Sequence, residues 1–425
     1  MSQASALGAA RPLTIGVETL REGLVAIAVL TSFVVMFEPA PYDLLFVLAI
    51  VLFSLTGLTL PRTLLPFVTL VALYQLGAVL TLSLVISRPD TLKWTIVGVF
   101  LAVTGVFYAL LLADRTEIRA RLIANAWVVA AVFGGALAII GYFHLGPGSD
   151  KFLLYGRAKG AFKDPNVYAP YLIFPALILI QRLYAAERLR QIIFILVPLG
   201  VIVSGIFLSF SRGSWGHLIA SAALMTGLTI LASPSPARRA RILLICCGAA
   251  VCATLLILVL LSLPSVSNLF AERASLEQGY DSGRYGRFGR HLLGAQIALV
   301  QPLGIGIYEF ARMFGSDVHN TYLNAFLSYG WLGGISLIAL VVITAVFGGR
   351  YVLSPTPWRP IFICAYSTWL VLMMEAWVID VDHWRHQWAL LGITWGLIGA
   401  TARFEKLRRS ASDATSRRLV DAPAR

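Results

Sequence analysis

The chain has 425 residues, of which 58% are hydrophobic and only 13% are charged, and its mean hydropathy is +0.80. A soluble domain carries about a quarter charged residues, so this composition excludes a soluble globular protein. The formal net charge of +13 does not indicate a nucleic-acid-binding protein. The basic residues lie in short loops between apolar segments and in the tail, where they set the orientation of a membrane protein.

Apolar segments recur along the chain, and each approaches the roughly 20 residues that a helix needs to cross a bilayer. None shows the period-two alternation of a membrane β-barrel, so the predicted fold class is an all-α integral membrane protein. The first segment follows Arg11 and Arg21 without a small-residue cleavage site and is expected to be a retained span. Twelve transmembrane spans are expected near residues 22–38, 42–59, 64–86, 92–113, 122–143, 166–182, 191–209, 214–232, 241–263, 320–347, 359–379 and 386–402.

The basic residues also predict the orientation. Twelve spans place both termini on one side, and that side carries most of the 34 Lys and Arg residues. Cytoplasmic loops are enriched in Lys and Arg, so we expect a bacterial inner-membrane protein with both termini in the cytoplasm. The expected parts are a cytoplasmic segment 1–21, spans over 22–143, a core over 144–347, spans over 348–402 and a basic cytoplasmic tail over 403–425, disordered from 410.

On the opposite, periplasmic side, two long loops, 144–165 and 264–319, hold most of the remaining basic residues. These residues oppose the topology signal and therefore need another explanation. The second loop lies between spans nine and ten and is large enough for a cap of short surface helices.

Arg212 stands alone between two apolar segments, in Ser211-Arg212-Gly213. A charge at this depth is costly and usually faces a cavity or a partner, so Arg212 is a candidate anion clamp. The alternative is a side chain that extends to lipid phosphates at the interface.

Three arginines, Arg284, Arg287 and Arg290, recur at a spacing of three and are followed by His291. In a helix this spacing lines one face, and guanidinium groups pair bidentately with phosphate oxygens. The row therefore suits a diphosphate. Intervening glycines weaken the case for a helix, and binding to anionic lipid headgroups is the alternative.

His319 opens a span at the outer interface, next to Asp317. A neutral imidazole there can take a proton from a sugar hydroxyl, although a lone histidine at a helix start is more often structural. The preceding Gly304-x-Gly306 is not a dinucleotide fingerprint, because no third glycine and no preceding strand accompany it.

Three other groups of residues are weaker candidates. The loop Tyr155–Asn166, with Arg157 and Lys159, suits either a glycan or phosphate, or only a tight turn. The four cysteines lie in apolar segments without CxxC spacing and are expected to be buried small side chains. The last outer loop is expected to be a solvated turn, because no second cluster completes a metal site around its ionisable residues, which are Asp380, Asp382, His383 and His386.

In order and spacing, several motifs resemble those of the O-antigen ligase and O-antigen polymerase superfamily, over residues 150–340. Each motif alone is loose, but the ordered set is fairly specific. The motifs are Gly156-Arg157-Ala158 to Phe162, Asp164-Pro165-Asn166, Ser211-Arg212-Gly213, Arg287-Phe288, Pro302-x-Gly304-x-Gly306, His319-Asn320-x-Tyr322-Leu323, Gly330 and Gly333-Gly334.

The resemblance implies a GT-C-like glycosyltransferase that needs neither metal nor cofactor and transfers an undecaprenyl-diphosphate-linked glycan with inversion. The superfamily's arginines carry over to Arg212 and Arg287, and its histidine carries over to His319. Arg284 is the alternative to Arg287, because the arginine pattern of the loop occurs twice in this sequence. An Arg290-His291 pair stands where an aromatic residue is usual. The remaining residues expected to bind substrate are Arg290, Arg157, Lys159, Asn320 and Tyr322.

Two alternatives stay open. A ligase transfers the glycan to a different glycolipid or glycan acceptor, whereas a polymerase joins lipid-linked repeat units, and the motifs do not separate them. A twelve-span transporter or flippase is the alternative from another class, since transporters bind substrate near the midplane. Glu375 supports it, because the sequence places this carboxylate near the middle of span eleven.

Overall fold

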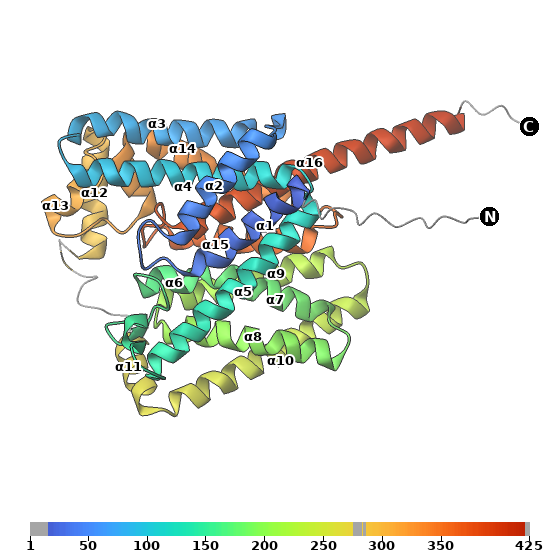
Figure 1. The fold of residues 1–425 in the computed structure, drawn as a ribbon, viewed down its shortest axis with the longest axis horizontal. Coiled ribbons are helices and arrows are strands. Elements are labelled where there is room, and N and C mark those ends of the chain that lie inside the picture. Colours follow the sequence, from blue (N-terminus) through green and yellow to red (C-terminus); the bar gives the residue numbers. More distant parts are fainter. Residues whose placement is uncertain (1–15, 275–282, 284–285, 421–425) are drawn as a thin grey trace, which may run out of the picture.

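The computed structural model describes residues 16–274, 283 and 286–420, which form a bundle of helices (Figure 1). In chain order the helices are α1 (Val17–Leu30), α2 (Pro41–Thr56), α3 (Leu65–Val85), α4 (Pro89–Ala113), α5 (Thr116–Tyr142), α6 (Pro165–Tyr171), α7 (Ile173–Ala185), α8 (Leu189–Leu208), α9 (Arg212–Ala232), α10 (Pro236–Leu261), α11 (Pro264–Ala274), α12 (Arg287–Val300), α13 (Glu309–Phe314), α14 (Thr321–Tyr351), α15 (Arg359–Glu375) and α16 (Arg385–Val420). The short elements are the 3₁₀ turns η1 (Thr31–Phe33), η2 (Arg62–Leu64) and η3 (Ser149–Phe152), and the antiparallel strands β1 (Leu153–Leu154) and β2 (Arg157–Ala158).

The fold is that of a multi-pass, all-α membrane protein. Among the described residues, eight helices are long and apolar enough to cross a bilayer: η2 with α3, α4, α5, α6 with α7, α8, α9, α10 and α14. Each of the twelve expected spans overlaps a helix, but α1, α2 and α15 have only 14, 16 and 17 residues. The count of twelve therefore stays a prediction.

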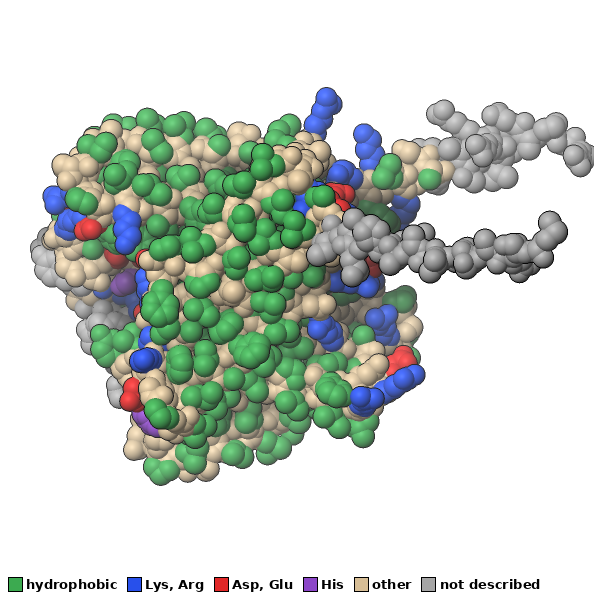
Figure 2. Space-filling view, viewed as in Figure 1, with side chains coloured by type: hydrophobic (Ala, Val, Ile, Leu, Met, Phe, Trp, Pro, Cys, Tyr) green, Lys and Arg blue, Asp and Glu red, His purple; other side chains and the backbone are tan. Residues whose placement is uncertain are grey.

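The surface of the bundle is apolar around its middle. Leu55, Phe194 and Ile219 are each more than half exposed, and Figure 2 shows hydrophobic side chains over most of one face, with Lys and Arg mainly toward the two ends. Exposed apolar area on this scale is unfavourable in water and suits contact with lipid.

Small residues let the central helices approach closely. On α4 and α16, a Cβ at Gly392 would overlap the carbonyl oxygen of Gly105, and on α3 and α14 a Cβ at Gly77 would lie 2.7 Å from the amide nitrogen of Gly333. Membrane helices lack a hydrophobic driving force for association, so close backbone contact through small residues contributes much of their packing. These pairs fix α14 and α16, which begin on either side of the candidate site.

The two ends of the bundle differ. We call the end that carries α12, α13 and the start of α14 the His319 end, and the opposite end, where α1 begins and α16 leaves the bundle, the terminal end (Figure 1).

Two sequence expectations outside the site are wrong. The tail is helical as far as Val420 and not disordered from residue 410, because α16 continues beyond the bundle without a helix-breaking residue. Of the four cysteines, only Cys364 is buried, whereas Cys247 and Cys252 are exposed on α10. That helix lies at the edge of the bundle in Figure 1 and presents most of its side chains outward.

Candidate functional site

The proline–glycine loop of the sequence motif (residues 302–306) supports the site by packing against a kink in α14. Gly330 interrupts that helix with φ 66° and ψ −171°, which leaves nearby backbone groups without helical partners. The Ile305 N–H donates to the freed Leu327 carbonyl at 2.7 Å. A Cβ at Gly304 would lie 2.6 Å from the same oxygen, so the glycine is required by close backbone approach.

The start of α14 is fixed to the segment that follows α15. Asn320 caps the helix, because its Oδ1 accepts from the Tyr322 N–H at 3.0 Å. The Thr321 N–H donates to the Ala376 carbonyl at 2.9 Å, and its Oγ1 donates to the Ile379 carbonyl at 2.8 Å. Asn320 and its neighbours therefore hold the segment after α15 beside His319.

This arrangement brings a carboxylate to His319. Nδ1 of His319 lies 3.7 Å from Oδ2 of Asp380, and Nε2 lies 3.4 Å from Oγ of Ser316. The first distance is longer than a hydrogen bond, and the two groups form a charge pair only when the imidazole is protonated. Burial and repulsion from Asp382 raise the pKa of Asp380, although the His319 side chain acts in the opposite direction. A carboxylate on this side of the ring favours an imidazolium formed when Nε2 accepts a proton.

The rest of the last outer loop is also ordered and largely buried. Asp382 lies 3.1 Å from Nδ1 of His383 and accepts from the Tyr329 hydroxyl at 3.2 Å. Although burial raises it, the pKa of Asp382 lies below its ordinary value because of the His383 charge and these hydrogen bonds. The expectation of a solvated turn is wrong, because the chain turns inward here to pair carboxylates with polar groups of α14.

Helix α12 brings basic residues to the same end. Its first residue is Arg287, and Arg290 one turn later is buried, with its charge lowering the pKa of Asp317. Burial and repulsion from Asp380 outweigh that effect, so the pKa of Asp317 is raised. Burial lowers the pKa of the neighbouring His291, which therefore favours its neutral form. The intervening glycines do not prevent a helix over these residues, and Arg284 lies outside the described residues.

Arg212 begins α9 and lies close to the end of α15. A Cβ on the next residue, Gly213, would overlap Oε1 of Glu375. The other oxygen of Glu375 lies 2.9 Å from Nδ1 of His217, whose Nε2 lies 3.0 Å from a backbone carbonyl of α15. The pair ties the start of α9 to the end of α15. Glu375 is the last residue of its helix, so its expected mid-span position is wrong.

Arg157 and Lys159 are engaged within the protein. Arg157 donates through Nε to the Ser209 carbonyl and through Nη2 to Asn166 Oδ1, both at 2.7 Å. Lys159 donates to the Phe162 carbonyl at 3.0 Å. The bond to Ser209 anchors the hairpin to the turn that precedes Arg212, and a substrate-binding role for Arg157 or Lys159 stays a prediction.

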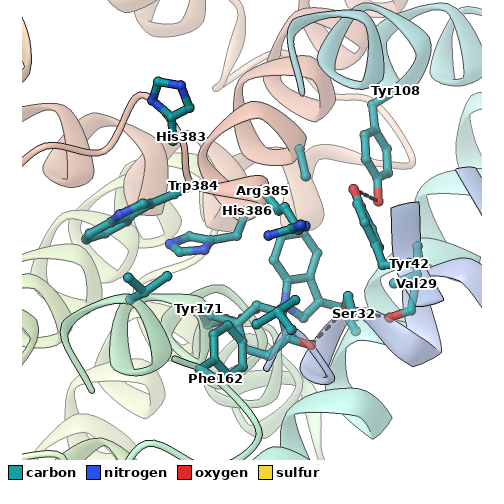
Figure 3. A pocket seen from close by; sticks show the side chains of 14 residues that line it. Val29, Ser32, Tyr42, Tyr108, Phe162, Tyr171, His383, Trp384, Arg385 and His386 are labelled. Atoms are coloured by element: carbon teal, nitrogen blue, oxygen red, sulfur yellow. Dashed lines mark hydrogen bonds between the residues drawn. The ribbon is translucent and has the colours of Figure 1, made fainter. Parts of the chain in front are cut away.

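Two cavities flank the segment before α16. The one in Figure 3 has a volume of about 40 Å³, enough for a water molecule. In Figure 3 the His386 ring lies beside Trp384 and above Tyr171, whereas the His383 ring points away from these three side chains. Nε2 of His386 is buried and has no hydrogen-bond partner among the described residues. A second cavity, of about 160 Å³, lies on the side of His319 and is lined by Trp94, Ile307, Tyr308, Asp317, Asn324, Ser328, Tyr329, Asp380, Asp382, His383 and Trp384.

Sequence reasoning missed Asp380 and His217 as parts of the site. No sequence signal joins Asp380 to His319. The two residues come together because Thr321, close to His319, forms hydrogen bonds to the segment that precedes Asp380. His217 carried a usable signal, since it is an ionisable residue inside an apolar segment, one turn beyond Arg212.

No protein-family model matches the chain, and no curated protein matches it.

Proposed function

We propose that this protein is a membrane glycosyltransferase that moves a glycan from undecaprenyl diphosphate to a glycolipid or glycan acceptor. The observation that carries the proposal is the pairing of His319 with Asp380 at the end of the bundle to which α12 brings its arginines. In this proposal the His319 end is periplasmic, the terminal end is cytoplasmic, and the chain has a GT-C-like fold of twelve spans in a bacterial inner membrane.

The proposed reaction is a single displacement. An acceptor hydroxyl gives its proton to Nε2 of His319, and its oxygen forms a bond to the anomeric carbon of the donor. The bond from that carbon to the diphosphate oxygen breaks, undecaprenyl diphosphate leaves with the electron pair, and the configuration inverts. Asp380 stabilises the imidazolium until the proton passes to solvent. A positioned base of this kind contributes about 10²–10⁴-fold to the rate.

The leaving group needs cations, because negative charge grows on the diphosphate as the bond breaks. Arg212 and Arg287 are the proposed clamp, each at the first position of a helix at the His319 end. Helix N-termini favour anions through their free N–H groups and dipoles. Arg290 is buried beside Asp317 and is proposed to shape the site. No metal or cofactor takes part in the proposed reaction.

Ligase and polymerase activities both fit this chemistry and differ only in the acceptor. The position of Glu375 favours transfer over transport: it is paired with His217 at a helix end, whereas transporters bind substrate near the midplane.

Reconstitution in liposomes tests the proposal. Purified protein receives an undecaprenyl-diphosphate oligosaccharide, with or without lipid A core, in the presence or absence of EDTA, and the products are resolved on a gel. A shifted lipid A band only with core indicates a ligase, and longer lipid-linked chains without core indicate a polymerase. We expect EDTA to leave the activity unchanged. Movement of the oligosaccharide across the bilayer without transfer would contradict the proposal.

A further inference from the structure

The cavity beside His319 has a chemically mixed lining. Trp94 of α4 and Tyr308 form an aromatic part of it, with ring centroids 5.6 Å apart and ring planes at 85°. The lining also includes hydrogen-bonding groups, among them Asn324, whose Oδ1 accepts from Ser328 Oγ at 2.8 Å. An aromatic face beside fixed polar groups suits a pyranose ring, which has an apolar face and a rim of hydroxyls.

Asp380 connects this cavity to His319. Its Oδ2 faces the imidazole, and its Oδ1 is buried and accepts no hydrogen bond from any described residue. Because the Asp380 side chain lines the cavity, a ligand hydroxyl there can donate to its carboxylate. A sugar hydroxyl bound there lies next to the proposed base, which is the position that the acceptor must occupy.

The charge of the cavity restricts which sugar it can hold. Asp317, Asp380 and Asp382 line it, and its one basic residue among the described lining residues, His383, lies 3.1 Å from Asp382, so that Asp317 and Asp380 have no cationic partner in the lining. Burial raises the pKa of both Asp317 and Asp380, and repulsion adds to it, from Asp380 in the case of Asp317 and from Asp382 in the case of Asp380. A further negative charge would add to this repulsion, whereas a neutral or cationic ligand would not.

We propose that this cavity is the acceptor-sugar subsite and that it takes a neutral or amino sugar ring, excluding uronic acids and phosphorylated sugars. The role of this sugar as the acceptor rests on the proposed function. The selectivity for a neutral or amino sugar follows from the cavity alone. The transferred glycan's diphosphate is held by arginines outside the cavity, so the site separates an anionic donor region from an acidic acceptor region.

Saturation-transfer difference NMR on the full-length protein in nanodiscs tests this assignment. The three probes are methyl glucoside, methyl glucosaminide and methyl glucuronide, with empty nanodiscs as the blank. We expect the first two to bind at least about tenfold more tightly than the glucuronide. Trp94→Ala should weaken the first two about tenfold, corresponding to about 1.4 kcal/mol. Trp94→Phe, which keeps a ring, and Trp377→Ala, which removes an exposed aromatic side chain outside the cavity, should bind like the parent protein.

Asp317→Asn removes one carboxylate charge with little change of shape, and it should narrow the difference between glucoside and glucuronide. Equal binding of all three glycosides by the parent protein, or unchanged binding in Trp94→Ala, would overturn the assignment. The same samples then enter the transfer assay. The expected sugar pattern without any transfer would refute the proposed function and leave the subsite. Transfer that is indifferent to acceptor charge would refute the subsite and leave the function.

Discussion

At the scale of single residues, ionisable groups at the His319 end occur in pairs that reduce the cost of burial. Asp382 pairs with His383 and Glu375 with His217, and removal of one partner would leave an uncompensated charge. His319 differs, because its side chain is 40% exposed while its partner Asp380 is 20% exposed. This imidazole therefore has a partly buried carboxylate on one side and is open to substrate on the other.

Asp380→Asn should lower kcat of the transfer about 10²-fold and leave KM for the donor nearly unchanged, because the amide no longer stabilises the imidazolium. Initial rates in the reconstituted assay measure both constants. Asp150→Asn is the matched control, since it removes the carboxylate of an exposed pair, 2.9 Å from His144. A loss of activity in the control equal to that in Asp380→Asn would contradict the assigned role.

Asp317→Asn should stabilise the protein at neutral pH. The pKa of Asp317 is raised in the folded state, so the parent protein loses stability as pH rises from 3.8 through the folded pKa. The amide removes that loss. Asp317→Asn and the parent protein should be equally stable at pH 3. At pH 7 the apparent Tm of the variant should be higher by on the order of 2 °C. An unchanged or lower apparent Tm at pH 7 would contradict the electrostatic account.

At the scale of elements, the site depends on a broken helix. The kink at Gly330 frees the Leu327 carbonyl for the loop 302–306, and that loop leads through α13 to His319. The start of α14 then holds the segment after α15 through Thr321. Two helix ends and one loop are thus positioned by hydrogen bonds to backbone carbonyls.

Gly330→Ala should destabilise the protein by about 1–3 kcal/mol, because alanine disfavours φ 66°. Its Cβ would also lie 2.7 Å from the Pro302 carbonyl oxygen. Apparent Tm and transfer rate should both fall. Gly227→Ala is the control, since a Cβ there meets nothing within 4 Å and the change should be neutral or slightly stabilising. Equal effects of the two substitutions would contradict a specific role for the kink.

At the scale of the whole molecule, composition was enough to predict an all-α membrane protein, and Arg212 lies at the predicted turn. Other features depend on tertiary contacts that no local pattern encodes. The pairing of Asp380 with His319 requires α14 and α15 to meet, and the position of Glu375 depends on where α15 ends. The sequence pattern does not determine the number of spans, because α1, α2 and α15 are shorter than the roughly 20 residues that a helix needs to cross a bilayer.

Thiol labelling tests the proposed orientation. In a chain whose native cysteines are replaced by serine, Leu145→Cys at the His319 end should react with an impermeant maleimide in intact cells after outer-membrane permeabilisation. Glu187→Cys at the terminal end should react only after the inner membrane is opened. Both parent side chains are exposed, so accessibility differs only by membrane side. The reverse pattern would place the His319 end in the cytoplasm.

The most direct test of the central claim is the release of undecaprenyl diphosphate during transfer. Purified protein is mixed with radiolabelled donor and acceptor, and free undecaprenyl diphosphate and new glycoside are quantified over time. We predict equal amounts of the two products with the parent protein and at least a 10²-fold slower release with His319→Ala, while the variant still binds donor. Parent-like release by His319→Ala, or glycoside formed without release of undecaprenyl diphosphate, would contradict the proposed reaction.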